Sequence, residues 1–405
     1  MTELHLLSPA GFRASGVYAG IKSRQAPDVG LLICDSAASA AALFTTNKVV
    51  AAPVKVGREH ILSGQSRGAV ANSGNANACT GAQGERDAKQ MCELAAAVAS
   101  CKRNEIIPAS TGIIGHFLPM DKVEQGIAEA GKYLGNSQEH ALLFADTILT
   151  TDTRRKTAAA EFKVNKQRVT IAGVCKGSGM IGPRLVPAGS KHATMLAYLT
   201  TDAKVAAPLL QRLLKSAADS TFNAVTIDDH TSTNDMALLL ASGASGVPIK
   251  GGKDLQSFSK ALNEVCRSLA YQIASDGEGA TKVVVITVRK AASASDAMLI
   301  ARAIANSPLV KCAMNGNDPN WGRIVSAAGM TNAKFEPNKA HLTLQGATVF
   351  TRGRPAEFER EALSAALTFH EVQVVLTCNL GKHEATCWTC DLSKDYVTIN
   401  ADYHT

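Results

Sequence analysis

Residues 171–203 read IAGVCKGSGMIGPRLVPAGSKHATMLAYLTTDA. A glycine-rich turn at 176–179 leads into a polar loop broken by prolines, and the loop ends at Ala193-Thr194, where an apolar run predicts a buried strand. If the bond between Ala193 and Thr194 were cut, Thr194 would carry a free α-amine beside its own hydroxyl. An α-amine titrates near pH ~8, so at neutral pH part of it is a free base that can activate the hydroxyl. The stretch therefore predicts a threonine nucleophile.

The overall composition is that of a globular protein, with 46% hydrophobic and 19% charged residues. At 405 residues the chain is too long for one small core, so two lobes are expected. The net charge of +7 is spread along the chain, which argues against a nucleic-acid or membrane partner. No apolar run approaches the ~18 residues of a membrane span. Ten scattered cysteines and a start without signal-peptide features indicate a cytoplasmic protein with reduced thiols.

Hydrophobic periodicity predicts both strands and helices, without the strict alternation of a β-α-β fold. This mixture favours layered α+β architecture. The C-terminal tail is not of low complexity, and we expect it to dock on the rest of the chain. The predicted strands lie near 28–35, 67–71, 106–110, 159–164, 167–174, 195–199, 224–227, 236–241, 282–288, 371–377 and 384–390, and the predicted helices near 86–101, 121–134, 138–149, 209–214, 255–274, 292–306 and 355–369.

Two polar segments follow predicted strands. Residues 72–77 contain three asparagines and a glycine, which predicts an irregular turn rather than a regular element. At 106–112 a strand is predicted to end in Ser-Thr-Gly, and its free N–H groups could bind an oxyanion. Taken alone, an ordinary turn is the better interpretation of that segment.

Two glycine motifs are rejected because their context is wrong. Residues 177–182 match G-x-G-x-x-G, but a dinucleotide site needs a helix directly afterwards, and Pro183 and Pro187 follow instead. Residues 64–68 match G-x-S-x-G, yet a helix-like stretch precedes the match and a strand follows it. That order is the reverse of a nucleophile elbow.

Two further clusters also have simpler interpretations. Asp229, His230 and Ser232 have the residue types of a hydrolase triad but stand too close together in sequence to converge, so a polar turn is favoured. Cys387 and Cys390 have no second pair with which to hold zinc, and they fall on a predicted strand. We expect no metal site.

With these residues in view, the chain resembles the ornithine acetyltransferase family (glutamate N-acetyltransferase, arginine biosynthesis). The resemblance runs in order over nearly the whole length, which is far more specific than any one motif. The matching stretches are ASTG at 109–112, KGSGMI at 176–181, ATML at 193–196, TTD at 200–202, FNAV at 222–225, STND at 232–235, SDGEG at 275–279, NDPNWGR at 317–323 and the tail to Thr405.

The resemblance implies a layered α/β/β/α-like sandwich of the N-terminal-threonine-nucleophile type, with a second, smaller lobe. It also implies self-cleavage between Ala193 and Thr194. The products would be an α chain, 1–193, and a β chain, 194–405, with a C-terminal lobe from about 280. The assembly implied is an α2β2 heterotetramer.

The chemistry implied is acetyl transfer. The Oγ of Thr194 attacks the acetyl carbonyl of N-acetylornithine, while donors at Thr111 and Gly112 stabilise the oxyanion. Ornithine leaves, and the amine of glutamate takes the acetyl group in a ping-pong cycle. No cofactor is expected, and acetyl-CoA is left open as a second acetyl donor.

Both substrates are amino acids, so each needs a partner for its carboxylate, and Lys176 is the natural candidate. The side-chain ammonium of ornithine suits a carboxylate, which the resemblance assigns to Glu278. A family threonine maps to Thr150, with Thr151 one step away. The full set of substrate-binding residues implied is Thr150, Lys176, Thr194, Glu278, Asn400 and Thr405.

One feature departs from the family, and two other functions stay open. The eleven residues from Gly182 to His192 make the loop before the cleavage site longer than in the family, which leaves the efficiency of processing in question. A threonine-nucleophile aminopeptidase or amidase would use water as the acceptor. An unprocessed, non-catalytic relative would bind a ligand without catalysing a reaction. The set Lys176, Glu278 and Asn400 favours the transferase.

Overall fold

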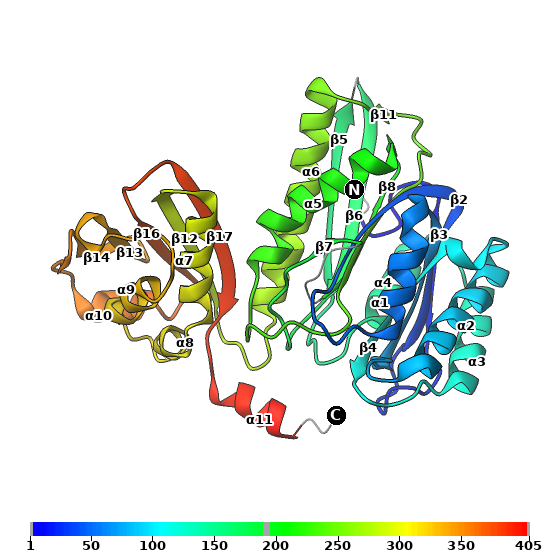
Figure 1. Ribbon diagram of the computed structural model, residues 1–405, viewed down its shortest axis with the longest axis horizontal. Coiled ribbons are helices and arrows are strands. Elements are labelled where there is room, and N and C mark those ends of the chain that lie inside the picture. The colour runs from blue at the N-terminus through cyan, green and yellow to red at the C-terminus, as the bar shows by residue number, and fades with distance from the viewer. Residues whose placement is uncertain (1–2, 165, 189–194, 403–405) are drawn as a thin grey trace.

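The computed structural model describes residues 3–164, 166–188 and 195–402 (Figure 1). Within these ranges, nine strands form one sheet and six form a second, and a small pair, β9 (Lys204–Val205) and β11 (Pro248–Ile249), stands apart. The chain thus combines helices with largely antiparallel sheets, and the predicted α+β class is confirmed. The predicted sites Ala193, Thr194 and Thr405 lie outside the described residues.

The larger sheet has the order β4-β3-β2-β10-β8-β6-β5, and β1 and β7 also pair with β2. Most neighbours are antiparallel, but β10 runs parallel to β8 and β3 runs parallel to β4. The strands are β1 (Phe12–Val17), β2 (Val29–Phe44), β3 (Gln65–Asn75), β4 (Ile106–Ile113), β5 (Lys156–Val164), β6 (Gln167–Lys176), β7 (Val186–Pro187), β8 (Leu196–Thr201) and β10 (Met236–Ala241).

The long strand β2 divides this sheet into two halves. Its first part pairs with β1 and β3, its last part pairs with β10, and its register with β3 shifts between Ile33 and Ala38. One face of both halves shares a single inner core, to which Leu32 contributes from the first half and Tyr198 from the second. A bend in β2 therefore lets one strand serve both β layers.

Helices cover the outer faces of the two halves (Figure 1). The first half packs against α2 and α3, and the second half packs against α5 and α6. The resulting order of layers is α/β/β/α, as predicted, with α1 and α4 lining the inner core. The helices are α1 (Ala52–His60), α2 (Gly81–Ala99), α3 (Met120–Lys132), α4 (Gln138–Thr147), α5 (Ala207–Ser220) and α6 (Gly252–Ser275).

The packing follows from side-chain periodicity. In β8 the residues Leu196 and Tyr198 face the inner core, while Ala197 and Leu199 face α5 and α6, because successive strand side chains alternate. Along α6 the buried residues recur every three or four positions and form one apolar stripe. Each fully buried leucine or phenylalanine contributes about 1.5–3 kcal/mol relative to an exposed one. Burial of these faces fixes the register of the sheet.

The second lobe is a six-stranded sheet of order β15-β14-β13-β16-β12-β17, with helices packed on one face. The serine hydroxyls of Ser293 and Ser307 cap α7 and α8 by accepting main-chain N–H groups. The elements are β12 (Val283–Ala291), α7 (Ala294–Asn306), α8 (Pro308–Asn315), α9 (Trp321–Gly329), β13 (His341–Leu344), β14 (Ala347–Thr351), β15 (Arg354–Pro355), α10 (Arg360–Ala366), β16 (Glu371–Thr377) and β17 (His383–Cys390).

The C-terminal tail returns to the first lobe as α11 (Lys394–Asp402). The Ser393 hydroxyl donates to the carbonyl of Gly279 at 2.6 Å, and the Tyr396 hydroxyl donates to Asp228 at 3.3 Å. The tail therefore docks, as predicted, and its helix ends near the loop that follows α6 (Figure 1).

Among the described residues, no single helix has both the length and the apolar character to cross a bilayer. The bent pair α7 and α8, with 58° between the two helices, reaches that length and composition, but both helices pack in the core of the second lobe.

Several predicted elements were wrong in extent or type. Residues 224–227 are not a strand, because Val225 makes only one isolated bridge, to Trp388 of the other lobe. The predicted helix at 355–369 is reduced to α10, since the chain leaves the hairpin of β14 and β15 only at residue 355. Residues 72–75 belong to β3 rather than to an irregular turn, because pairing with β4 continues past a shift in register at Gly74. The helices α8, α9 and α11 were not predicted.

A glycine in β3 provides a test of the close approach between β2 and β3. Gly68 has a φ of +146°, and a Cβ there would stand 2.0 Å from the carbonyl oxygen of Leu32. Gly115 also has a positive φ, +91°, but no atom lies within 4 Å of its Cβ position. We expect Gly68→Ala to lower the free energy of unfolding by about 2–3 kcal/mol more than Gly115→Ala, because only the first adds a clash. Equal losses in urea unfolding would contradict this.

Candidate active site

A cavity of about 200 Å³ opens where the ends of several strands of the large sheet meet. Strands β4, β6, β8 and β10 reach it, together with the loops after α4 and α6 and the tail helix α11. Its wall is formed by Ala76, Thr111, Gly112, Ile114, Thr150, Thr151, Lys176, Gly179, Met180, Ile181, Met195, Leu196, Ser232, Thr233, Asn234, Asp235, Glu278 and Asn400.

Every site residue predicted from the sequence that the structure describes lies in this wall. They come from positions as far apart as 111 and 400, so only the fold brings them together. Thr150 and Thr151 both line the cavity, so the alternative between them stays open. Met195, which directly follows the predicted nucleophile, also lines it and is buried.

Lys176 is the cation of the cavity wall. It ends β6, is 9% exposed, and its Nζ donates to the Thr111 hydroxyl at 3.3 Å. No carboxylate accepts from this ammonium among the residues described. A buried ammonium that donates to no carboxylate is suited to bind the carboxylate of a ligand.

Thr111 and Gly112 lie near the end of β4, which pairs with β3. The sequence predicted that this strand ends at Gly112, but it continues for one more residue, to Ile113. Gly112 has a φ of +131°, and a Cβ there would stand 2.4 Å from the main-chain carbon of Gly74. Only glycine therefore allows the two strands to approach this closely beside the cavity.

Glu278 is a carboxylate residue of the same cavity wall. Its side chain accepts a hydrogen bond from the amide of Asn400 at 2.9 Å, and its main-chain N–H donates to Ser178 at 2.8 Å. A Cβ at Gly179 would lie 2.2 Å from the carboxylate. The glycine-rich turn is thus shaped to let Glu278 reach the wall.

A buried ion network holds this turn in place. Lys156, which is fully buried, donates from Nζ to Asp152 at 2.6 Å and to Asp276 at 2.5 Å. Asp152 also accepts from the main-chain N–H of Gly177 at 2.7 Å, and of Thr150 at 3.1 Å. One lysine therefore links the loops after α4 and α6 to the turn that carries Lys176.

The charges in this network are strongly coupled. Burial by itself raises the pKa of Asp152, but the ammonium groups of Lys156 and Lys176 and the N–H of Gly177 outweigh it and lower the pKa to about 2. Burial likewise lowers the pKa of Lys156, and the carboxylates of Asp152 and Asp276 overcome that effect and raise it. Asp152 and Lys156 are therefore both charged at neutral pH.

Four residues near the cavity received no role from the sequence. Asp152 and Lys156 form the ion network, Asn234 binds the carbonyls of Ala76 and Ser110, and Asp235 is buried in the cavity wall. The STND stretch at 232–235 was recognised only as a family match. A lysine or aspartate with no local motif carries no sequence signal of its burial or its partners.

The rejected motifs remain rejected. The turn at 177–182 leads to an extended segment and β7, not to a helix. Asp229 contacts the exposed Arg184 at 3.2 Å, and His230 is exposed. Cys387 and Cys390 are buried free thiols on β17. Among the described residues, no three side chains of His, Cys, Asp or Glu gather as metal ligands would.

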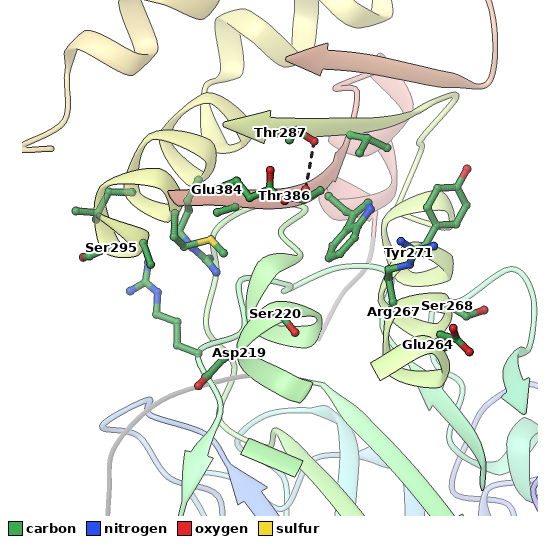
Figure 2. Close-up of a pocket in the computed structure, with 18 of the residues that line it drawn as sticks. Asp219, Ser220, Glu264, Arg267, Ser268, Tyr271, Thr287, Ser295, Glu384 and Thr386 are labelled. Atoms are coloured by element: carbon green, nitrogen blue, oxygen red, sulfur yellow. Dashed lines mark hydrogen bonds between the residues drawn. The ribbon is translucent and has the colours of Figure 1, made fainter. Parts of the chain in front are cut away.

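A larger groove of about 1570 Å³ lies between α5 and α6 on one side and the second lobe on the other (Figure 2). Figure 2 shows Glu264, Arg267 and Tyr271 on α6, and Thr287 and Thr386 on two strands of the second lobe. The hydroxyls of the two threonines are 3.2 Å apart. Acidic and basic side chains both line this groove, and none of the predicted site residues does. The smaller cavity has the convergent groups that chemistry requires.

Residues 13–405 match the ArgJ family. The chain is 42% identical over 403 residues to the arginine biosynthesis bifunctional protein ArgJ of Bacillus cereus, covering 99% of this chain and 97% of that protein. It is 45% identical over 404 residues to the protein of the same name from Symbiobacterium thermophilum, covering 98% of each.

Two solved structures are also similar. The arginine biosynthesis bifunctional protein ArgJ of Bacillus halodurans is 37% identical, with a TM-score of 0.49, over 50% of this chain and 97% of that one. An ornithine acetyltransferase from Mycobacterium tuberculosis, solved in complex with ornithine, is 36% identical, with a TM-score of 0.40, over 45% of this chain and 96% of that one.

A small cavity in which a few polar groups converge is the usual form of an enzyme's binding site. The extent of the family match makes the assignment specific: the chain belongs to the ArgJ family. The family predicted from the sequence, and with it the class of enzyme, an acetyltransferase, is therefore confirmed.

The ion network predicts a large effect of its central lysine on stability. Lys156→Met leaves two buried carboxylates without a cation, and we expect a loss of about 3–5 kcal/mol in the free energy of unfolding. Lys132→Met, which removes an exposed ion pair with Glu129, is the control and should leave the free energy of unfolding nearly unchanged. Denaturant unfolding of both variants tests this, and similar losses would show that the buried network does not stabilise the loops.

Proposed function

We propose that this protein is a glutamate N-acetyltransferase that moves the acetyl group of N-acetylornithine to glutamate through an acetyl ester on Thr194. The observation that carries the proposal is the cavity itself. Lys176 and Glu278, of opposite charge, line it together with Thr111 and Gly112, and Met195 places the start of β8 in the same wall.

The proposed binding mode follows from charge. The α-carboxylate of either substrate pairs with the buried ammonium of Lys176, and the side-chain ammonium of ornithine pairs with Glu278. The amide of Asn400, which now contacts Glu278, offers a donor for the side-chain carboxylate of glutamate. One site can therefore take both amino acids in turn, as a ping-pong cycle requires.

The proposed nucleophile requires processing. The α-amine of Thr194 exists only if the bond to Ala193 is cut, so we include self-cleavage into chains 1–193 and 194–405 in the proposal, with an α2β2 heterotetramer as its assembly. The amine then takes the proton of Oγ as the hydroxyl attacks, and the donors at Thr111 and Gly112 hold the oxyanion. Such a donor contributes about 3–4 kcal/mol in known cases. Thr405 completes the proposed substrate contacts.

The proposal also includes a second acetyl donor and a cellular location. Because the curated relatives are named bifunctional, we propose acetyl-CoA as an additional acetyl donor to the same threonine. The ten free cysteines suit a reducing compartment, which we take to be the cytoplasm.

A hydrolase is the competing candidate, since water could accept the acetyl group from the same ester. The charges of Lys176 and Glu278 favour the transferase, because water needs no amino-acid recognition in the second half-reaction.

Incubation with N-acetylornithine and glutamate tests the proposal. We expect ornithine and N-acetylglutamate in equal amounts, and two bands on a denaturing gel in place of one of 42.4 kDa. Thr194→Ala should give the intact band and no exchange. Release of acetate without N-acetylglutamate would identify a hydrolase, and an intact, inactive wild-type chain would identify a non-catalytic relative.

The proposed binding mode also predicts an asymmetric effect at Glu278. Glu278→Gln removes the charge that pairs with the ornithine side chain, and hydrogen bonds to charged groups contribute about 1.5–3 kcal/mol. The KM for N-acetylornithine should therefore rise about tenfold or more, while the KM for glutamate should stay the same or fall. Glu264→Gln, in the larger groove, is the matched control. Steady-state kinetics with each substrate varied would contradict the binding mode if both KM values rose equally.

A further inference from the structure

Asp235 is a buried carboxyl group that has no assigned task. It is 1% exposed, it lines the cavity, and neither of its side-chain oxygens has a hydrogen-bond partner among the described residues. Buried polar groups in native proteins are nearly always paired. An unpaired carboxyl in the wall of an active-site cavity therefore indicates a group that meets a ligand.

The main chain fixes Asp235 beside the reacting end of the cavity. Strand β10 runs parallel to β8 with Met236 opposite Leu196, and the N–H of Met236 donates to the carbonyl of Met195 at 2.6 Å. The carbonyl of Asp235 accepts from Thr45 at 3.0 Å. Asp235 thus stands next to the residue that follows the proposed nucleophile.

The surroundings of this carboxyl disfavour its charged form. Burial raises the pKa of Asp235 well above its usual range, and Lys176 lowers it only in part. The other charged groups nearby are Glu278, which lines the same cavity, and Arg58 of α1, whose guanidinium donates to the carbonyl of Thr45. A neutral acid in such a place ionises readily when a new positive charge forms beside it.

The proposed exchange leaves one proton unaccounted for. Free glutamate enters as an ammonium ion and must become an amine before it can attack the ester. Ornithine is released from an amide and leaves as an ammonium ion. The proton of the threonine hydroxyl is already taken by the α-amine and returned to the leaving nitrogen. One further proton must therefore be held in the site between the two half-reactions.

On the basis of the acetyl exchange proposed above, we propose that Asp235 carries this proton. In the first half-reaction the O–H bond of its neutral carboxylic acid breaks and a new N–H bond forms on the departing ornithine amine. In the second, an N–H bond of the glutamate ammonium breaks and the O–H bond of Asp235 re-forms. The carboxyl thus returns to its starting state after each cycle.

The other two titratable side chains of the described wall, Lys176 and Glu278, have other roles in the proposed binding mode. The ammonium of Lys176 pairs with a carboxylate in the proposed binding mode, and it already donates to Thr111. Glu278 is held by Asn400 and faces the far end of the ornithine side chain. Asp235 is the remaining titratable side chain in the described wall of the cavity.

The test compares two acceptors on an isolated acetyl-enzyme. The enzyme is acetylated with N-acetylornithine, ornithine is removed, and loss of the acetyl group is followed with glutamate or with hydroxylamine, an amine that is uncharged at neutral pH. In Asp235→Asn we expect the glutamate reaction to slow about 100-fold or more, as for other general acid–base groups. The hydroxylamine reaction should change by less than about threefold, because that acceptor has no proton to lose before attack.

Asp229→Asn is the matched control, since this exposed carboxylate lies in the same loop and outside the cavity wall. It should leave both reactions unchanged. If Asp235→Asn changed neither rate relative to wild type, or slowed both reactions by the same factor, the role of Asp235 would be overturned. A wild-type enzyme that forms no acetyl-enzyme, or never makes N-acetylglutamate, would instead disprove the exchange itself.

The wild-type enzyme gives a second measurement if the variant does not fold or is not processed. With Asp235 as the proton acceptor, the rate with glutamate should rise with pH and then level off once the carboxylate is formed. The hydroxylamine rate should show no such step over the range in which hydroxylamine is uncharged. A glutamate rate that climbs steadily to the pKa of the free glutamate amine would show that glutamate loses its proton to solvent, and the proposal would fail.

Discussion

The ammonium of Lys156 lies between the carboxylates of Asp152 and Asp276 with no access to water, and three segments depend on this contact. The loop after α4, the loop after α6 and the turn that follows β6 are far apart in sequence. Desolvation of the three charges is costly, and it is offset only because each carboxylate also accepts main-chain N–H groups. The position of the turn that holds Lys176 is therefore set by charges that lie behind the cavity wall.

Few charged side chains line the described wall of the cavity. Lys176 and Glu278 are separated enough to avoid pairing with each other, and each keeps a neutral neighbour, Thr111 or Asn400. A salt bridge between them would have consumed the binding energy that an amino acid needs. The site stays open to a zwitterion because its own opposite charges are held apart by the fold.

The sequence predicted the fold class, and the predicted site residues that the structure describes lie around one cavity, although their roles remain predictions. Family motifs located Lys176, Glu278 and Asn400, because these side chains sit in short, distinctive stretches. Periodicity located the long helix α6 and the strand β8, whose apolar faces are regular. It missed α8 and α9, which flank a polar segment and are short.

The residues that were not predicted share a physical cause. Asp152, Lys156 and Asp235 are ordinary charged residues in the sequence, and their importance comes from burial and from tertiary contacts. Lys156 has a partner 120 positions away in Asp276, whereas Asp235 has no side-chain partner among the described residues. Burial of a charge is a property of the tertiary structure. The strand prediction at 224–227 was wrong for a related reason: the backbone of Val225 has its single bridge partner, Trp388, in the other lobe, and the sequence does not show this contact.

The tail helix α11 ties the second lobe to the cavity. It follows β17, a strand of the six-stranded sheet, yet its Asn400 lines the cavity and donates to Glu278. A shift of the second lobe relative to the large sheet would therefore pull on the cavity wall. The second lobe has a mechanical link to the site, although none of its described strands lines the cavity.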